Sequence, residues 1–220
     1  MEKILQAILN GATGEEIAAL PLPATYRAAY VQKEDQTMWD GVPSNEKDPR
    51  KSIHIGQVDL PELAADEVVI AVMASSINFN TVWTSIFEPI STFGALARLG
   101  KESKWAKRHD IDKHVIGSDA SGVVLRVGSA VRLWNPGDKI TVHCNHVDDQ
   151  DPSSHSDSMM GSNQRIWGYE TNFGGLADLA VVKANQLMPN LLTSRGKKQQ
   201  STHCVTQLAI ACSFLKTAPT

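Results

Sequence analysis

Between His114 and Cys144 the chain consists of short apolar runs rich in Val, Ile and Leu, separated by glycines at positions 117, 122, 128 and 137. Runs of this kind, bounded by turn residues, predict β-strands. The sequence Asn-Pro-Gly-Asp at 135–138 supplies the residues that a tight turn requires. Short strands joined by glycine turns favour a small antiparallel barrel over a parallel sheet.

The rest of the chain surrounds this barrel with few helices. Apolar spacing predicts a helix and a shorter helical turn within residues 2–20, the second capped by Thr13 and Glu16. Residues 26–32 read as a strand, β-rich sequence begins at residue 53, residues 88–112 look helical, and residues 175–182 form a closing strand. We therefore predict a mainly β fold with peripheral helices (α+β), divided into a helical segment 1–25, a barrel domain 26–189 and a tail 190–220.

Composition excludes several classes of protein. The 220 residues carry a formal net charge of −3, so no basic excess points to nucleic acid. The longest apolar runs are too short to span a membrane. The N-terminus lacks the features of a secretory signal. Three cysteines with no paired spacing fit a reduced, cytoplasmic setting.

The segment Ile166–Gly175, IWGYETNFGG, combines aromatic and polar side chains in an unusual density. A carboxylate and an amide among aromatic rings can form a small-molecule site, and paired glycines let a backbone approach a ligand. The alternative is an irregular loop whose aromatics plug the end of a barrel. The segment alone leaves both interpretations open.

Two groups of side chains have a structural interpretation. His143, Cys144, His146 and His155 suggest a metal cluster, but a core cysteine with solvent-facing histidines is favoured. Five basic residues fall at helical spacing and predict a solvated face, with contact to CoA phosphates as the alternative: Arg98, Lys101, Lys104, Lys107 and Arg108.

A family resemblance rests on longer motifs. The sequence GSDASGVV at 117–124, followed by Val-Gly at 127–128 and PGDKI at 136–140, resembles the GroES-like barrel of medium-chain dehydrogenases/reductases. Three further stretches, at 48–63, 72–94 and 165–189, resemble crotonyl-CoA carboxylase/reductase. The likeness runs nearly continuously from residue 1 to Pro189.

The resemblance implies a reaction and a site. In that family, hydride from NADPH adds to the β-carbon of crotonyl-CoA, and the enolate attacks CO2 to give ethylmalonyl-CoA. The residues that order CO2 and water in the family match Asn80, Glu170 and Tyr169 here. A fourth residue, a His, is expected in a distal part of the catalytic domain outside this chain. The resemblance also implies that full-length relatives are homo-oligomers.

Elementary chemistry is consistent with those roles. CO2 has neither charge nor dipole, so its capture depends on preorganised donors in a water-poor pocket. Asn80 can donate an N–H to a CO2 oxygen, whereas an ionised Glu170 repels those oxygens and is better placed to hold a bridging water or protein partners. Exclusion of water also limits protonation of the enolate, which is the competing simple reduction.

Zinc is not expected. In zinc alcohol dehydrogenases, which share this barrel, the catalytic metal is bound by a Cys in the loop where Asn78-Phe79-Asn80 stands and by a His where Ser118 stands. Two other functions remain open: an enoyl-CoA or quinone reductase of the same superfamily, and a GroES-like barrel without catalytic function.

The tail departs from the family. Residues 190–220 contain no Asp or Glu and hold two of the three cysteines. The family continues after the proline with a sequence close to KPAHLTWEEAAVNALCNSTSYR. Codons ending in G for residues 196–200, read from their last base, encode Glu-Glu-Ala-Ala-Val. We hypothesise that one base was lost near the codon for Asn190, so that the tail is out of frame; the alternative is a diverged tail.

This hypothesis has a direct test. We expect the DNA to lack one base near the codon for Asn190, and purified residues 1–220 to show no crotonyl-CoA-dependent NADPH oxidation, because by the resemblance the NADPH-binding Rossmann domain is missing. An unbroken frame without a long shifted reading frame downstream contradicts the first expectation, and measurable turnover contradicts the second.

Overall fold

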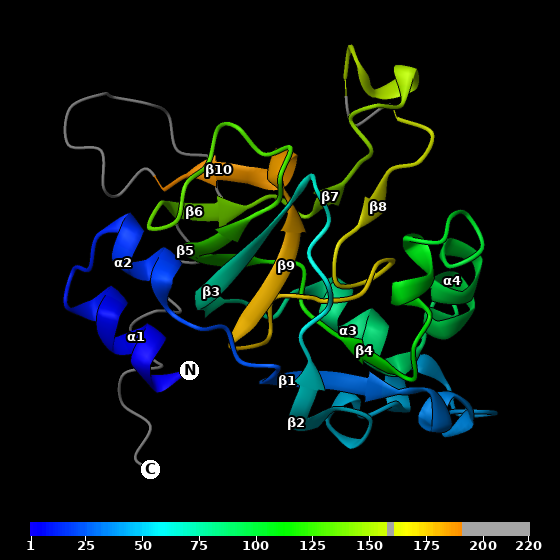
Figure 1. Ribbon diagram of the computed structural model, residues 1–220. Helices are drawn as coiled ribbons and strands as arrows, with labels where there is room; N and C mark the ends of the chain where they lie inside the picture. The colour runs from blue at the N-terminus through cyan, green and yellow to red at the C-terminus, as the bar shows by residue number, and fades with distance from the viewer. Residues whose placement is uncertain (158–160, 191–220) are drawn as a thin grey trace.

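The computed structural model describes residues 1–157 and 161–190 (Figure 1). Its α-helices are α1 (Glu2–Leu9), α2 (Gly14–Ala19), α3 (Phe79–Ile86) and α4 (Thr92–Leu99). Its strands are β1 (Thr25–Gln32), β2 (His54–Asp59), β3 (Glu67–Ser75), β4 (Lys113–Val115), β5 (Ala120–Val127), β6 (Lys139–Val142), β7 (Asn145–His146), β8 (Arg165–Ile166), β9 (Leu179–Lys183) and β10 (Leu187–Pro189). Short 3-10 turns are η1 (Lys33–Thr37), η2 (Ser44–Glu46), η3 (Pro49–Lys51), η4 (Ala106–His109), η5 (Pro152–Ser154) and η7 (Ala184–Gln186).

The strands form an antiparallel barrel-like arrangement. A five-stranded sheet has the order β10-β6-β5-β3-β9, a three-stranded sheet has the order β2-β1-β4, and β7 pairs with β8. A bridge between Ala28 and Ala177 connects β1 with the segment that leads into β9. Helices α1 and α2 lie on one side of the strands, and α3 and α4 lie on the other (Figure 1). The predicted mainly β fold with peripheral helices is confirmed.

Strand β3 is covered on both faces. Val68 and Ile70 pack in a cluster with Trp167, whereas Val69 and Ala71 pack in a second cluster that includes residues of α1 and α2. Because successive side chains of a strand point to opposite faces, this alternation fixes the register of β3 within the sheet. The strand therefore sits at the centre of the fold.

The N-terminal helices pack onto this core. The predicted capping box is present: the backbone N–H of Thr13 donates to Glu16 Oε2 at 2.7 Å, and the backbone N–H of Glu16 donates to Thr13 Oγ1 at 3.3 Å. The guanidinium of Arg126 on β5 donates to the carbonyls of Ile17 and Leu20 at the end of α2. The domain division at residue 25 stays a prediction.

The helix predicted over residues 88–112 is wrong in its length. Helix α4 begins after Ser91, whose hydroxyl accepts from the N–H of Gly94, and it ends at Leu99. Gly100 follows, and a Cβ at that position would lie 2.8 Å from the Cβ of Asp110. The chain turns back against itself there, so the helical spacing does not continue through the basic run.

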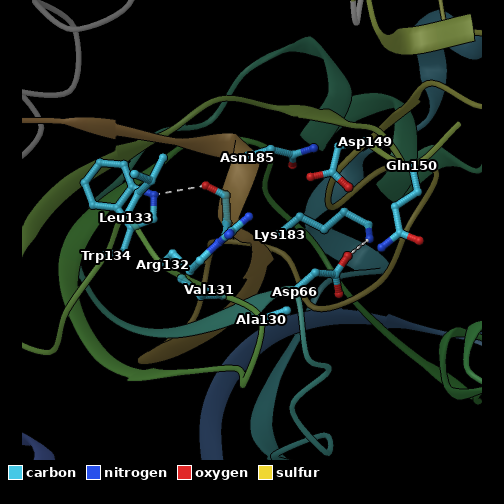
Figure 2. A pocket seen from close by; sticks show the side chains of 11 residues that line it. Asp66, Ala130, Val131, Arg132, Leu133, Trp134, Asp149, Gln150, Lys183 and Asn185 are labelled. Carbon is cyan, nitrogen blue, oxygen red and sulfur yellow. Dashed lines mark hydrogen bonds and ion pairs between the residues drawn. The ribbon is translucent and has the colours of Figure 1, made fainter. Parts of the chain in front are cut away.

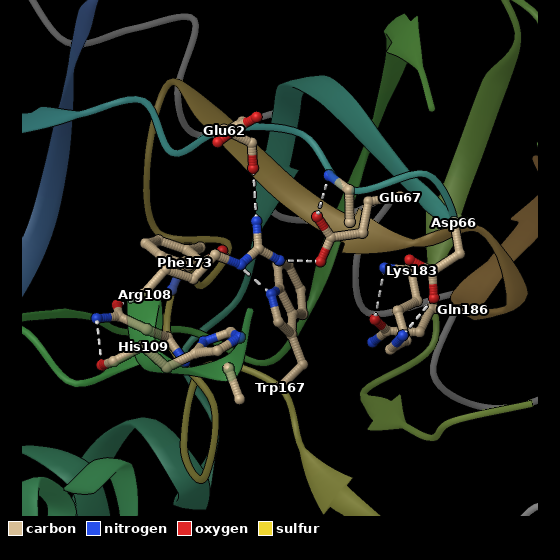
Figure 3. A network of polar contacts seen from close by, with 12 residues as sticks. Glu62, Asp66, Glu67, Arg108, His109, Trp167, Phe173, Lys183 and Gln186 are labelled. Atoms are coloured by element: carbon tan, nitrogen blue, oxygen red, sulfur yellow. Dashed lines mark hydrogen bonds and ion pairs between the residues drawn. The ribbon is translucent and has the colours of Figure 1, made fainter. Parts of the chain in front are cut away.

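Arg108 also corrects the prediction of a solvated basic face. The other four residues of the run are exposed, but the guanidinium of Arg108 forms an ion pair with the buried carboxylate of Glu67 (Figure 3). It also donates to the carbonyl of Glu62 at 2.6 Å and lies over the ring of Phe173 at 5.5 Å. A buried charge requires such partners. Arg108 thereby fastens residues 106–109 to the start of β3 and to the Ile166–Gly175 segment.

Candidate functional site

Asn80 lies on the first turn of α3, which follows β3. The side chain of Asn78 caps this helix, since its Oδ1 accepts from the backbone N–H of Thr81 at 3.1 Å. An asparagine cap satisfies one of the free N–H groups at a helix start. Asn80 is half-buried beside it. The segment predicted to replace the zinc-binding loop is therefore a capped helix start.

The buried hydroxyl of Ser118 holds both asparagines. It accepts from Asn78 Nδ2 at 2.7 Å and from Asn80 Nδ2 at 3.1 Å, and Ser118 has no exposed surface. Asn78 Nδ2 also donates to Asp119 Oδ2 at 2.6 Å, which occupies its second N–H. The second N–H and the Oδ1 of Asn80 make no hydrogen bond to the described residues. Ser118 therefore orients the amide of Asn80 through one N–H, and the other N–H is available to a ligand.

Tyr169 and Glu170 lie in a tight turn. The carbonyl of Ile166 accepts from the backbone N–H groups of Tyr169, Glu170 and Thr171, the second at 2.7 Å. Glu170 Oε2 in turn accepts from the backbone N–H of Ile166 at 2.8 Å. One carboxylate oxygen of Glu170 thus closes its own turn, and the other makes no hydrogen bond within the part of the chain that the structure describes.

The phenol of Tyr169 is buried and anchored. Its hydroxyl lies close to the backbone of Ile90, in the connection between α3 and α4. Burial raises the pKa of this phenol, the charge of Glu170 raises it further, and the contact with Ile90 opposes both. Tyr169 is therefore neutral at physiological pH and links the turn to the helices beside Asn80.

Two aromatics of the Ile166–Gly175 segment do plug the barrel. Trp167 is 1% exposed among the apolar residues of the five-stranded sheet, and its indole N–H donates to the carbonyl of Phe173 at 3.1 Å. Phe173 is 3% exposed in the second core cluster. The plug interpretation is therefore confirmed for Trp167 and Phe173. The small-molecule site at Tyr169 and Glu170 stays a prediction.

Asn172 attaches the segment to β4. Its Oδ1 accepts from the N–H groups of Val115 and Phe173 at 2.9 and 2.7 Å, and its Nδ2 donates to the carbonyl of Lys113 at 2.8 Å. Its own backbone N–H donates to His109 Nδ1 at 3.2 Å. An amide with this many partners has a structural role, which explains the polar residue inside an aromatic segment.

The two halves of the candidate site meet at Gly117 and Ser118. The N–H of Gly175 donates to the carbonyl of Gly117 at 2.8 Å. Gly168 has φ of +70°, and a Cβ there would lie 2.0 Å from the same carbonyl, so only glycine fits. The next residue, Ser118, holds Asn80. Asn80 and Glu170 thus have different hydrogen-bond partners but share one support, and sequence reasoning had considered Ser118 only as the place of a missing zinc ligand.

Exposed apolar side chains flank Asn80. Ile77 is 74% exposed and Phe79 is 79% exposed. Neighbouring apolar side chains of this kind are typical of a surface that receives a ligand or another protein surface. Both lie within three residues of Asn80, at the start of α3.

The predicted arrangement of a core cysteine with solvent-facing histidines is wrong for two residues, Cys144 and His146. His143 and His155 are exposed and Cys144 is half-buried, but His146 is also half-buried and meets the ring of His109 edge-on at 6.3 Å. Residue 143 follows the end of β6, so the predicted alternation along a strand does not extend to these positions. Among the residues described, no group of three or more His, Cys, Asp or Glu is placed to hold a metal ion.

Three histidines lie beside the Ile166–Gly175 segment, of which His109 and His114 are buried and His146 is half-buried. Burial is the main cause that lowers the pKa of His109 to about 2, of His114 to about 4 and of His146 to about 3. Nearby cationic side chains, Arg108 and Lys183 among them, lower the values of His109 and His146 further. All three are therefore neutral near pH 7.

A cavity of about 420 Å³ lies away from Asn80 (Figure 2). It is lined by the Asp66–Lys183 ion pair and by Arg132 and Trp134, among others. Asp66 precedes the first residue of β3, whereas Asn80 follows the last, and a strand of this length spans roughly 25 Å. The cavity is therefore not part of the candidate site.

Comparison with known proteins identifies the class. Residues 64–192 match the alcohol dehydrogenase GroES-like domain family, and the antiparallel fold agrees with that match. The chain belongs to this family. In the part that the structure describes, no helix is long and apolar enough to cross a membrane.

Within that class the chain is similar to crotonyl-CoA reductases, as the sequence predicted. It is 54% identical to the crotonyl-CoA reductase of Streptomyces avermitilis over 190 residues, which cover 86% of this chain and 43% of that protein. It is 37% identical to the crotonyl-CoA carboxylase/reductase of Cereibacter sphaeroides over 142 residues, 64% of this chain and 30% of that protein.

A solved structure shows the same relationship. The 2-octenoyl-CoA carboxylase reductase CinF from Streptomyces sp., in complex with NADP and 2-octenoyl-CoA, superposes with a TM-score of 0.82 at 54% identity. The superposition covers 85% of this chain and 42% of that structure. The chain thus spans less than half the length of these relatives. The tail hypothesised to be out of frame lies, from residue 191 onward, outside the described residues.

The lowered pKa values of His109, His114 and His146 predict a loss of stability in mild acid. Each folded-state pKa lies below the ordinary value of 6.5, so below that pH the unfolded state binds more protons and the free energy of unfolding falls. Each histidine contributes a slope of up to about 1.4 kcal/mol per pH unit. Denaturant unfolding between about pH 7 and pH 5 measures this slope. His114→Gln should lower the slope by the contribution of one histidine. A slope that is unchanged in that variant contradicts the assignment.

Proposed function

We propose that this chain forms the barrel part of an NADPH-dependent enzyme that reductively carboxylates a short enoyl-CoA, converting crotonyl-CoA to ethylmalonyl-CoA. The observation that carries the proposal is the 54% identity to the 2-octenoyl-CoA carboxylase reductase CinF over 85% of this chain, together with the 54% identity to crotonyl-CoA reductase over 190 residues. Because the matched residues make up 43% of that relative, the activity belongs to the whole protein and not to the barrel alone.

In this proposal Asn80 orients CO2. Ser118 fixes one N–H of its amide, so the direction of the second N–H is defined as well. A single hydrogen bond contributes only about 0.5–1.5 kcal/mol, so its value lies in geometry more than in affinity. The donor holds CO2 where the α-carbon of the enolate forms the new carbon–carbon bond.

Tyr169 and Glu170 form the opposite wall. The buried phenol of Tyr169 limits access of water, and the carboxylate oxygen of Glu170 that does not close the turn can hold one water molecule away from the enolate. Both functions favour addition of CO2 over addition of a proton.

NADPH would supply the hydride that generates the enolate. The one connection from a strand into an α-helix among the described residues, between β3 and α3, contains no glycine and does not fit a dinucleotide's phosphates. We therefore assign no described residue to the cofactor, and the residues of this chain act only on CO2, water and the acyl group.

A simple enoyl-CoA reductase is the second candidate. The relative from Streptomyces avermitilis is named crotonyl-CoA reductase, without carboxylation in its name. In that case the enolate is protonated and butyryl-CoA is the product. We further infer a cytoplasmic setting, from the unpaired cysteines, and a homo-oligomer for the full-length protein.

A chimaera tests the proposal. Residues 1–189 replace the matched segment of the Streptomyces avermitilis protein, and products from crotonyl-CoA, NADPH and bicarbonate are quantified. We expect ethylmalonyl-CoA as the main product. Asn80→Ala should reduce the ratio of ethylmalonyl-CoA to butyryl-CoA by about 3- to 10-fold, which corresponds to one hydrogen bond.

Asn185→Ala is the matched control, because it removes an exposed amide beyond the other end of β3. It should leave the product ratio unchanged. Butyryl-CoA as the sole product of the unmodified chimaera supports the simple reductase and contradicts carboxylation, and an unchanged ratio in Asn80→Ala contradicts the role of Asn80.

A further inference from the structure

His114 is a completely buried histidine that the proposed reaction does not use. It is the central residue of β4 and has no exposed surface. Its Nε2 lies 3.2 Å from the carbonyl oxygen of Gly168, and its Nδ1 is buried without a hydrogen-bond partner in the described structure. Because a carbonyl only accepts, Nε2 must carry the proton and Nδ1 must be bare.

A buried nitrogen without a hydrogen-bond partner lowers the stability of the fold. Burial of a polar atom without a partner costs stability, and an apolar side chain of similar size would fill the same space without that cost. Packing therefore does not explain the imidazole. Its single polar contact, with the Gly168 carbonyl, is the feature that a leucine or phenylalanine could not reproduce.

The Gly168 carbonyl belongs to the peptide that precedes Tyr169. Gly168 has φ of +70° and packs against the carbonyl of Gly117 on one side, while His114 holds its own carbonyl. The backbone N–H of Gly168 donates to the carbonyl of Thr171 at 3.0 Å. The N–H of the Gly168–Tyr169 peptide itself donates to the carbonyl of Ile166 at 3.2 Å. Both peptides that flank the Cα of Gly168 are thus held by hydrogen bonds, and the direction in which Tyr169 and Glu170 leave them follows.

We propose that His114 is a positioning residue that fixes the turn bearing Tyr169 and Glu170 through its Nε2–H bond to the Gly168 carbonyl. The assignment rests on the proposed function for its catalytic consequence. His114 lies four residues before Ser118, which holds Asn80, so one short segment positions both walls of the proposed CO2 pocket.

The local claim is tested on the 220-residue chain by amide hydrogen exchange. In His114→Leu, the amides of Tyr169 and Glu170 should exchange at least tenfold faster relative to amides of β3. In His114→Gln, which retains an N–H donor, they should stay close to the wild-type rate. Leu125→Ala, a core truncation on β5, controls for general destabilisation and should not single out the turn.

A second measurement needs no variant. Imidazole ¹⁵N shifts of His114 in the wild-type chain should show protonated Nε2 and unprotonated Nδ1 between about pH 7 and pH 5, because its pKa of about 4 lies below that range. A protonated Nδ1 with a bare Nε2 overturns the proposal. Equal turn exchange in His114→Leu and Leu125→Ala also overturns it.

The catalytic consequence is tested in the chimaera. His114→Leu should lower the ratio of ethylmalonyl-CoA to butyryl-CoA at least fivefold, and His114→Gln should restore most of it. A purely structural role reduces both products together, so a constant ratio contradicts positioning. If the unmodified chimaera forms no ethylmalonyl-CoA while the exchange result holds, the proposed function fails and the local role of His114 stands.

Discussion

The close approach of two backbones at Gly117 governs the candidate site. Its carbonyl accepts from Gly175 and leaves no room for a side chain on Gly168. This contact brings the Ile166–Gly175 segment against the residues that follow β4, where Ser118 holds Asn80. Asn80 and the turn with Glu170, about ninety residues apart in sequence, therefore share one rigid support. Neither needs a direct contact with the other for their relative position to be defined.

Buried polar groups make that support rigid. Asn172 bonds to backbone groups at both ends of β4, Arg108 pairs with Glu67 and lies over Phe173, and His114 holds the Gly168 carbonyl. Such groups are costly to bury singly and specify one arrangement when they are connected. A ligand such as CO2 offers little binding energy, so a site for it depends on preorganisation. The presence of buried polar groups that are costly to bury is consistent with this requirement for preorganisation.

Local signals in the sequence predicted what local physics determines. The strands, the N-terminal helices and the Thr13–Glu16 cap follow from spacing and side-chain chemistry within a few residues. Periodicity failed for Arg108 and His146, because helical or strand spacing cannot show that a distant carboxylate or ring will cover a polar side chain. The positions of Asn80, Tyr169 and Glu170 were taken from a family resemblance, and their catalytic roles stay predictions. Ser118 and His114 carry no signal of their own, since their partners lie far away in sequence.

The central claim is that residues 114–118 orient the groups that handle CO2. The most direct measurement is the fraction of product labelled by ¹³C-bicarbonate in the Ser118→Ala variant of the chimaera. Loss of this hydroxyl removes one hydrogen bond from each asparagine, but Asn78 stays bonded to Asp119, whereas the side chain of Asn80 loses the one partner that it has among the described residues. The account predicts a several-fold lower labelled fraction with continued NADPH oxidation. An unchanged labelled fraction would contradict it.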